Sequence, residues 1–161
     1  MGYTTDFTGR FDLDRELDSK TFNFLTKLAE TRRMRRSLSE LPETGFEKYG
    51  FDNWGTEGEF FVDAEGFAGQ DRDSSVLDYN SPPTTQPGLW CQWLPTNDRK
   101  SIEWNGGEKF YHYKAWLEYI ICNVLEPRGY ILNGTVDWHG EDPSDSGQLK
   151  VKDNVLYVES K

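Results

Sequence analysis

The sequence predicts an α+β fold: one domain of 161 residues, with a mainly antiparallel sheet and two helices packed on one of its faces. Two segments have helical periodicity, Lys20–Arg36 and Lys109–Leu125, and segments of strand-like alternation lie before, between and after them. Helices that are separated by runs of strands are typical of α+β proteins. The expected element order is therefore β-α-β-β-β-α-β-β-β, in a single domain over residues 1–161.

The first predicted strand, Tyr3–Leu17, alternates between apolar and polar side chains. Its apolar face carries Tyr3, Thr5, Phe7, Phe11 and Leu13. Gly9 falls on this buried face, where a glycine predicts a bulge or a close approach of another backbone.

The first predicted helix begins at Lys20, with Asp18 or Ser19 as its N-cap, and ends at Arg36. Its last turns are rich in arginine, which suits the negative end of the helix dipole. A second interpretation is an anion site, because Arg32 and Arg36 lie four residues apart and guanidinium groups bind phosphate.

The segment from Ser37 to Ser81 is irregular, apart from a short predicted strand at Glu59–Val62. Two loops in and just after it, Gly66–Asp73 and Val76–Pro83, are dense in hydrogen-bonding side chains. Such a long irregular region in a compact domain is usually functional or disordered. Its many aromatic residues argue against disorder.

A tryptophan-rich stretch follows, and it predicts a central strand at Leu89–Leu94 because both of its faces are apolar. Alternation places Trp90 and Trp93 on opposite faces, so one of them is available to a ligand. Ser101–Trp104 is the next predicted strand. Asn105 is the expected N-cap of the second helix, which Pro127 and Gly129 end.

The C-terminal part predicts a meander of three strands: Tyr130–His139, Leu149–Lys152 and Val155–Val158. Asp153–Asn154 is the expected two-residue turn between the last two, because both residue types tolerate left-handed backbone geometry.

The chain is acidic, with 28 acidic against 18 basic residues and a net charge of −10. This charge argues against a nucleic-acid binder that works by bulk electrostatic attraction. Cys91 and Cys122 lie in apolar runs, so we expect both thiols to be reduced and buried. The sequence shows no secretory signal and no membrane-spanning apolar run, which favours the cytoplasm.

Motifs along nearly the whole chain resemble those of a family of small acidic proteins that tailed phages and some bacteria encode. They are Thr5–Gly9 (TDFTG), Glu30–Arg33 (ETRR), Gly69–Asp73 (GQDRD), Asp78–Asn80 (DYN), Gln86–Trp93 (QPGLWCQW), Glu103–Tyr111 (EWNGGEKFY), Gly129–Gly134 (GYILNG) and Lys152–Asn154 (KDN). The family has no established activity. The resemblance therefore implies a setting, a phage accessory protein in the host cytoplasm, and no mechanism.

No known catalytic motif is present, neither a phosphate-binding loop nor a nucleophile elbow nor a Cys-x-x-Cys pair. His112 and His139 have no metal-ligand spacing with the two cysteines. We therefore expect no cofactor, and the sequence favours a protein that is not an enzyme. Acidic pairs such as Asp71 and Asp73 leave a carboxylate-held metal or a general base open.

The candidate site is a binding surface of aromatic rings, amides, carboxylates and cations. Its predicted residues are Arg32, Arg36, Gln70, Asp71, Arg72, Asp78, Tyr79, Asn80, Trp90, Gln92, Trp104, Lys109 and Tyr111. Bases stack on rings, carboxylates accept from ribose hydroxyls and arginines bind phosphates, so the set suits a nucleotide-like molecule. The alternative is that the rings form the core and the charges are solvated.

Three functional hypotheses follow. The first is non-enzymatic binding of a small nucleotide-derived ligand, which in a phage would sequester a host immune signal. The second is an acidic phage protein that binds and inhibits a host protein. The third is a hydrolase or transferase that acts on a nucleotide or on ADP-ribose. Each is compatible with a homo-oligomer.

Overall fold

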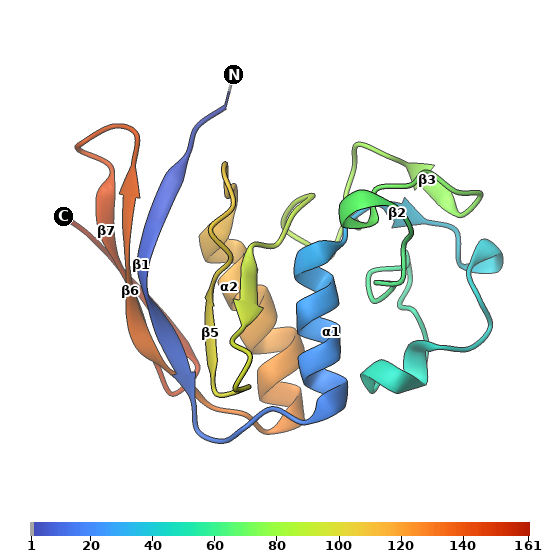
Figure 1. Ribbon diagram of the computed structural model, residues 1–161, viewed down its shortest axis with the longest axis horizontal. Helices are drawn as coiled ribbons and strands as arrows, with labels where there is room; N and C mark the ends of the chain where they lie inside the picture. The colour runs from blue at the N-terminus through green and yellow to red at the C-terminus, as the bar shows by residue number, and fades with distance from the viewer. Residues whose placement is uncertain (1) are drawn as a thin grey trace. The chain divides into compact units, whose positions relative to one another are not determined.

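A computed structural model describes residues 2–161, which form two compact units. The sheet unit contains residues 2–17 and Gln92–Lys161, and the helix–loop unit contains Asp18–Cys91 (Figure 1). The α+β class is confirmed, because antiparallel strands and two α-helices make up the regular structure of residues 2–161. Whether the two units behave as one domain stays a prediction.

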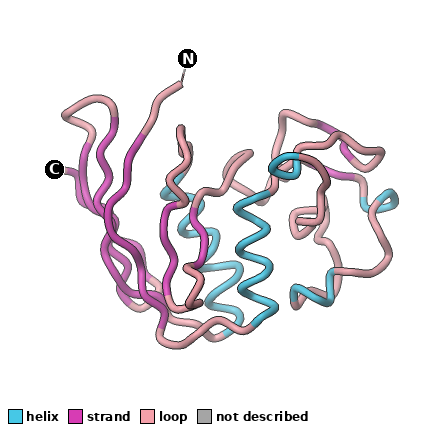
Figure 2. The backbone as a smooth tube through the Cα atoms, in the orientation of Figure 1, coloured by secondary structure: helices cyan, strands magenta, loops and turns pink. Residues whose placement is uncertain are grey.

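The sheet unit is built on one six-stranded antiparallel sheet in the order β4-β5-β1-β6-β7-β8. Strands are drawn in magenta in Figure 2. The strands are β1 (Thr5–Leu13), β4 (Trp93–Pro95), β5 (Ser101–Trp104), β6 (Leu132–Gly140), β7 (Ser146–Lys152) and β8 (Val155–Ser160). The predicted C-terminal meander is confirmed. Its Asp153–Asn154 turn has the expected left-handed backbone at both residues, with φ of 46° and 69°.

One face of this sheet is apolar, and helix α2 (Tyr113–Ile120) packs on it. The Phe7 ring makes edge contacts with Trp93 and Tyr113, at centroid distances of 5.2 and 4.9 Å. The indole N–H of Trp93 also donates to the Tyr113 carbonyl at 2.9 Å, which ties β4 to α2. Trp93 is therefore the inward-facing tryptophan. Helix α1 belongs to the other unit, so its predicted place on the same face stays a prediction.

The second helix begins later than the sequence predicts, at Tyr113 and not at Lys109. Lys109 and His112 both adopt left-handed backbone, with φ of 57° and 60°, so residues 109–112 do not form a first helical turn. Asn105 is not an N-cap, because its side chain accepts from the Gly107 N–H in a local turn. The helix continues as a π-helix, Ile121–Leu125, and a 3₁₀ turn, Glu126–Arg128, and it ends at Gly129 as predicted.

The predicted central strand at Leu89–Leu94 is wrong. Its ordered part is β4, which starts at Trp93 and lies at an edge of the sheet. Leu89 does not join the sheet, because its carbonyl accepts from the Arg33 N–H at 2.8 Å. Pro95 has no N–H to donate, which suits an edge strand.

The helix–loop unit begins with α1 (Ser19–Glu30), and the side chain of Asp18 caps it as predicted by accepting from the Thr21 N–H. The predicted extension of α1 to Arg36 is wrong. Thr31 is extended, with φ −121° and ψ 126°, and its hydroxyl bonds the carbonyls of Lys27 and Val62. The arginine-rich segment is therefore extended, and strand β2 (Arg35–Arg36) pairs with β3 (Val76–Asp78), a segment that the sequence predicts as loop.

Glu59–Val62 is not a strand, although Glu59, Phe61 and Val62 are buried. The carbonyls of Glu59 and Phe61 accept from the buried guanidinium of Arg33, at 2.7 and 3.0 Å. A side chain thus supplies the donors that a neighbouring strand would give. The segment is ordered without a sheet.

Short 3₁₀ turns and stacked rings order the rest of this unit. The turns are Leu38–Glu40, Phe46–Tyr49 and Phe67–Gly69. The rings of Phe51 and Phe60 stack at 4.1 Å, and Trp54 meets Phe61 edge-on at 5.1 Å. Aromatic packing therefore forms the core of this irregular region.

The prediction for the thiols is confirmed for Cys91, which is free and buried, and wrong for Cys122, which is free and exposed. The buried positions of the π-helical segment are Ile121, Val124 and Leu125, and Cys122 lies on the opposite face. Within residues 2–161, no helix combines the length and the apolar character that crossing a membrane requires.

Candidate functional site

The helix–loop unit gathers six of the predicted site residues into one cluster. The guanidinium of Arg32 lies over the Tyr79 ring at 4.1 Å and 6.0 Å from the Trp90 ring. The Arg72 guanidinium lies 5.4 Å from the same Tyr79 ring. We call this set, which Gln70 and Asn80 complete, the arginine–aromatic cluster.

Hydrogen bonds fix the geometry of the arginine–aromatic cluster. Arg32 donates through Nε to the Tyr79 carbonyl at 3.1 Å and through Nη2 to Oδ1 of Asn80 at 3.3 Å. The Tyr79 hydroxyl donates to Oε1 of Gln70, also at 3.3 Å. Extended backbone after α1 projects Arg32 toward the segment after β3, so the early end of α1 is what builds this contact.

Arg32 and Arg72 both have N–H groups that donate to no protein acceptor among residues 2–161 and can therefore donate to a ligand. Within the described part of the chain, neither Arg32 nor Arg72 lies within 4.0 Å of a carboxylate oxygen, and Arg72 donates no hydrogen bond to the protein. The carboxylate of Asp78 interacts electrostatically with Arg72. The Asn80 N–H and the Ser81 side chain hold the pKa of this carboxyl below its usual range, and the charges of Arg35 and Arg72 add to the effect.

Arg36 and Asp71 do not join the cluster. Arg36 is buried and bonds Asp73 and Ser75, so the predicted anion site of Arg32 with Arg36 is wrong. The two residues lie four apart on an extended segment, not on one helix face. The Asp71 carboxylate lies against the backbone of Gly66, where a Cβ would come within 2.1 Å of its oxygen.

The other four predicted residues, Gln92, Trp104, Lys109 and Tyr111, belong to the sheet unit. The Gln92 amide accepts from the Trp104 indole at 3.2 Å and donates to the Glu108 carbonyl at 2.8 Å, so it holds the turn after β5 in place. The Tyr111 hydroxyl accepts from the Tyr3 N–H at 3.0 Å. These bonds give Gln92, Trp104 and Tyr111 structural roles inside this unit.

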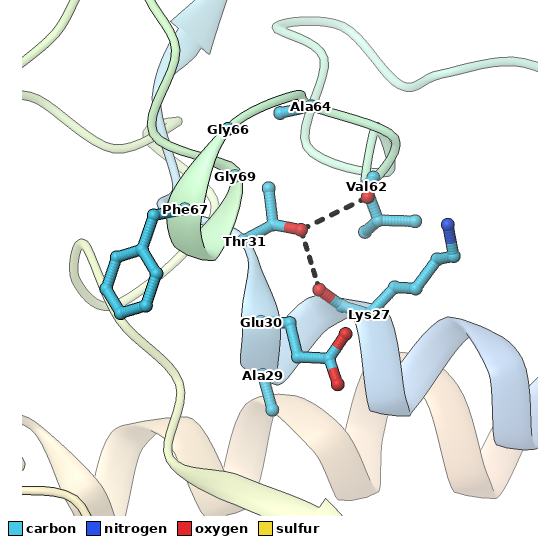
Figure 3. A pocket seen from close by; sticks show the side chains of 9 residues that line it. All are labelled: Lys27, Ala29, Glu30, Thr31, Val62, Ala64, Gly66, Phe67 and Gly69. Carbon is cyan, nitrogen blue, oxygen red and sulfur yellow. Dashed lines mark hydrogen bonds between the residues drawn. The ribbon is translucent and has the colours of Figure 1, made fainter.

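The structure also shows a pocket of about 410 Å³ that the sequence did not indicate (Figure 3). It lies at the C-terminal end of α1, and its lining is Lys27, Ala29, Glu30, Thr31, Val62, Ala64, Gly66, Phe67 and Gly69. Phe67 stands at its rim with 89% of its surface exposed. The one sequence signal was the Gly66–Gly69 turn, whose glycines bracket this ring at φ of 86° and 58°.

Within residues 2–161, no group of three His, Cys, Asp or Glu side chains is arranged to hold a metal ion. His112 occupies the turn before α2, and His139 is an exposed residue of β6. A general base among the acidic pairs stays a prediction.

Comparisons with protein-family models, with curated proteins and with solved structures find no match to this chain. The resemblance to the phage-encoded family stays a prediction. The site alone therefore bears on the function of this chain.

Proposed function

We propose that the arginine–aromatic cluster binds a small nucleotide-derived ligand without transforming it. The observation that carries this proposal is the pair of arginines around one tyrosine ring, neither of them ion-paired within the described residues. Two cations beside flat rings suit an anion that carries a planar group. The net charge of −10 on the whole chain disfavours bulk nucleic acid, so a small anion is the better partner for this local cationic surface.

Each member has a role in this proposal. Arg72 has all five of its N–H donors available for a phosphate, and Arg32 retains Nη1. Trp90 is half-buried and offers a face on which a base stacks. The Gln70 amide, whose oxygen accepts from Tyr79, keeps its N–H₂ donors for a base edge. In the phage setting that the sequence resemblance implies, the ligand would be a host immune signalling nucleotide and the activity its sequestration.

The test is a panel of mono-, di- and cyclic nucleotides and ADP-ribose, followed by thermal shift, calorimetry and chromatography of the recovered ligand. Binding with intact ligand is the expected result. Turnover would support the hydrolase or transferase instead, and no binding by any compound would overturn the proposal and favour the inhibitor of a host protein.

Variants tie the binding to the cluster. Arg72→Ala should weaken it by about 1.5–3 kcal/mol, or roughly tenfold or more, because a charge-assisted bond is lost. Trp90→Ala should cost a similar amount while Trp90→Phe retains a stacking face. Arg10→Ala, which removes the same charge from an exposed position in the sheet unit, is the matched control and should bind as the wild type does.

A further inference from the structure

The two edges of the six-stranded sheet differ in how open they are to another strand. The β4 edge has three residues and includes Pro95, which lacks an N–H. The β8 edge has six residues and no proline. Its side chains include three exposed apolar groups, Val155, Tyr157 and Val158, with exposed fractions of 51%, 50% and 43%. An open apolar edge of this kind pairs readily with another strand.

The register of β7 with β8 tells which backbone groups point outward. Lys152 is opposite Val155 across the two-residue turn, and the Lys161 N–H donates to the Ser146 carbonyl at 2.9 Å. In an antiparallel ladder, every second residue bonds a given neighbour. Val155, Tyr157 and Glu159 therefore bond β7. The N–H and C=O groups of Leu156, Val158 and Ser160 point away from the sheet.

We propose that two copies of this chain associate through antiparallel pairing of β8 with β8, around a two-fold axis at Val158. This register aligns Leu156 with Ser160 of the second copy and Val158 with Val158 of the second copy. All three outward-pointing residues of each strand then bond their partners. A shift of two residues along the strand would leave some of these groups unpaired.

Charge complementarity favours a second copy as the occupant. In this register Tyr157 is opposite Glu159 of the second copy, and Lys150 of β7 lies on the other side of Tyr157 in the same row. The two-fold axis repeats the arrangement. Both Tyr157–Glu159 rows therefore carry charges of opposite sign, and no like charges lie directly opposite each other across the new strand pair.

The expected dimer is weak, because one six-residue strand buries less area than a standard interface. It does not depend on the proposed ligand binding, since the arginine–aromatic cluster lies in the helix–loop unit. A failure of one proposal leaves the other intact.

Sedimentation velocity over a wide range of protein concentration tests the pairing. The expected result is a reversible rise of the average mass towards twice that of one chain. Val158→Pro removes the central outward N–H without touching the β7 ladder, and it should weaken dimerisation roughly tenfold or more. Val158→Thr, which keeps the N–H, should retain the dimer.

A charge reversal at one position tests the register itself. Tyr157→Glu would place a carboxylate opposite Glu159 of the second copy, and the two-fold axis would repeat this repulsion in a second, equivalent pair. The variant should therefore not dimerise. Tyr157→Lys loses the same ring but faces that carboxylate with an opposite charge, so it should dimerise at least as well as the wild type. A monomer at every concentration, or a dimer that responds equally to Glu and Lys at position 157, would overturn the proposal.

Discussion

Nη1 of Arg36 lies 2.9 Å from Oδ2 of Asp73 and joins a side chain that is 2% exposed to one that is 45% exposed. The same nitrogen donates to the Ser75 hydroxyl at 2.7 Å, and the guanidinium lies 4.7 Å from the Phe61 ring. Burial raises the pKa of Asp73, but hydrogen bonds from Ser75 and Arg36 outweigh it and leave this pKa below its ordinary value. The pair therefore fastens β2 to the loop before β3.

Loss of this carboxylate should destabilise the helix–loop unit. Asp73→Ala would leave the buried Arg36 with Ser75 as its remaining side-chain hydrogen-bond partner, and we expect a loss of about 1.5–3 kcal/mol in the free energy of unfolding. Urea denaturation measures it. Ser74→Ala, at the exposed neighbouring position, is the control, and equal losses in the two variants would show that the ion pair is not what holds the loop.

Asp63 should make the free energy of unfolding depend on pH in the acidic range. Its carboxylate accepts from Lys27 at 3.1 Å, from Lys48 at 3.2 Å and from the Tyr49 hydroxyl. Burial raises the pKa of Asp63, but the bonds from Tyr49, Lys27 and Lys48 outweigh it and lower the pKa overall. Burial and the hydrogen bond to Asp63 raise the pKa of Tyr49, so this hydroxyl stays a donor.

The direction of the pH effect follows from the lowered pKa of Asp63. A carboxyl that is more acidic when folded stabilises the fold above its unfolded pKa, about 3.9, and loses this contribution as pH falls through the folded value. The free energy of unfolding should therefore decline below about pH 4. Asp63→Asn should flatten that decline and lower stability near neutral pH, with the exposed Asp52→Asn as control; an unchanged slope in Asp63→Asn would refute the assignment.

Local signals explain which parts of the fold could be predicted. The β7–β8 hairpin was predictable because alternation and a two-residue Asp153–Asn154 turn are both properties of neighbouring residues. The end of α1 was not predictable, because it depends on distant hydrogen bonds. The side chains of Thr31 and Arg33 donate to the carbonyls of Val62, Glu59 and Phe61. Partners that lie about thirty residues along the chain leave no local pattern.

The candidate site was predictable in its residue types and not in their partners. Arg32, Tyr79 and Trp90 come together as the chemistry of rings and cations suggested. Arg36 and Gln92 carry the same kinds of groups, yet their hydrogen bonds serve the protein itself. Composition cannot distinguish a polar group that faces a ligand from one that satisfies the backbone, and the pocket at the end of α1 left almost no signal.

Thiol labelling should separate the two cysteines. Cys122 is exposed on the π-helical segment and should react rapidly in the native protein, whereas Cys91 is fully buried and should react only after unfolding. Mass spectrometry after a short exposure to a maleimide counts the modified thiols. Cys122→Ser should abolish the rapid reaction, and a rapid second label on Cys91 would mean that the buried thiol is transiently accessible.

Two glycines offer a matched test of the contact between β1 and β6. Gly134 is opposite Phe11 and has φ of +146°, and a Cβ there would lie 2.8 Å from the Arg10 carbonyl oxygen and 2.9 Å from the Phe11 Cα. Gly106 has φ of +82°, and a Cβ there would meet nothing within 4 Å. Both changes to alanine strain the backbone, but Gly134→Ala alone also forces two strands apart.

Gly106→Ala should therefore lose about 1–2 kcal/mol of unfolding free energy, which is the cost of the left-handed backbone. Gly134→Ala should lose about 1–3 kcal/mol more, because neither the Arg10 carbonyl nor the Phe11 Cα is a flexible side-chain end that can move aside. Chemical denaturation of the two variants beside the wild type gives the difference directly. Equal losses would contradict this prediction, because they would mean that β1 and β6 separate without cost at Gly134, opposite the fully buried Phe11.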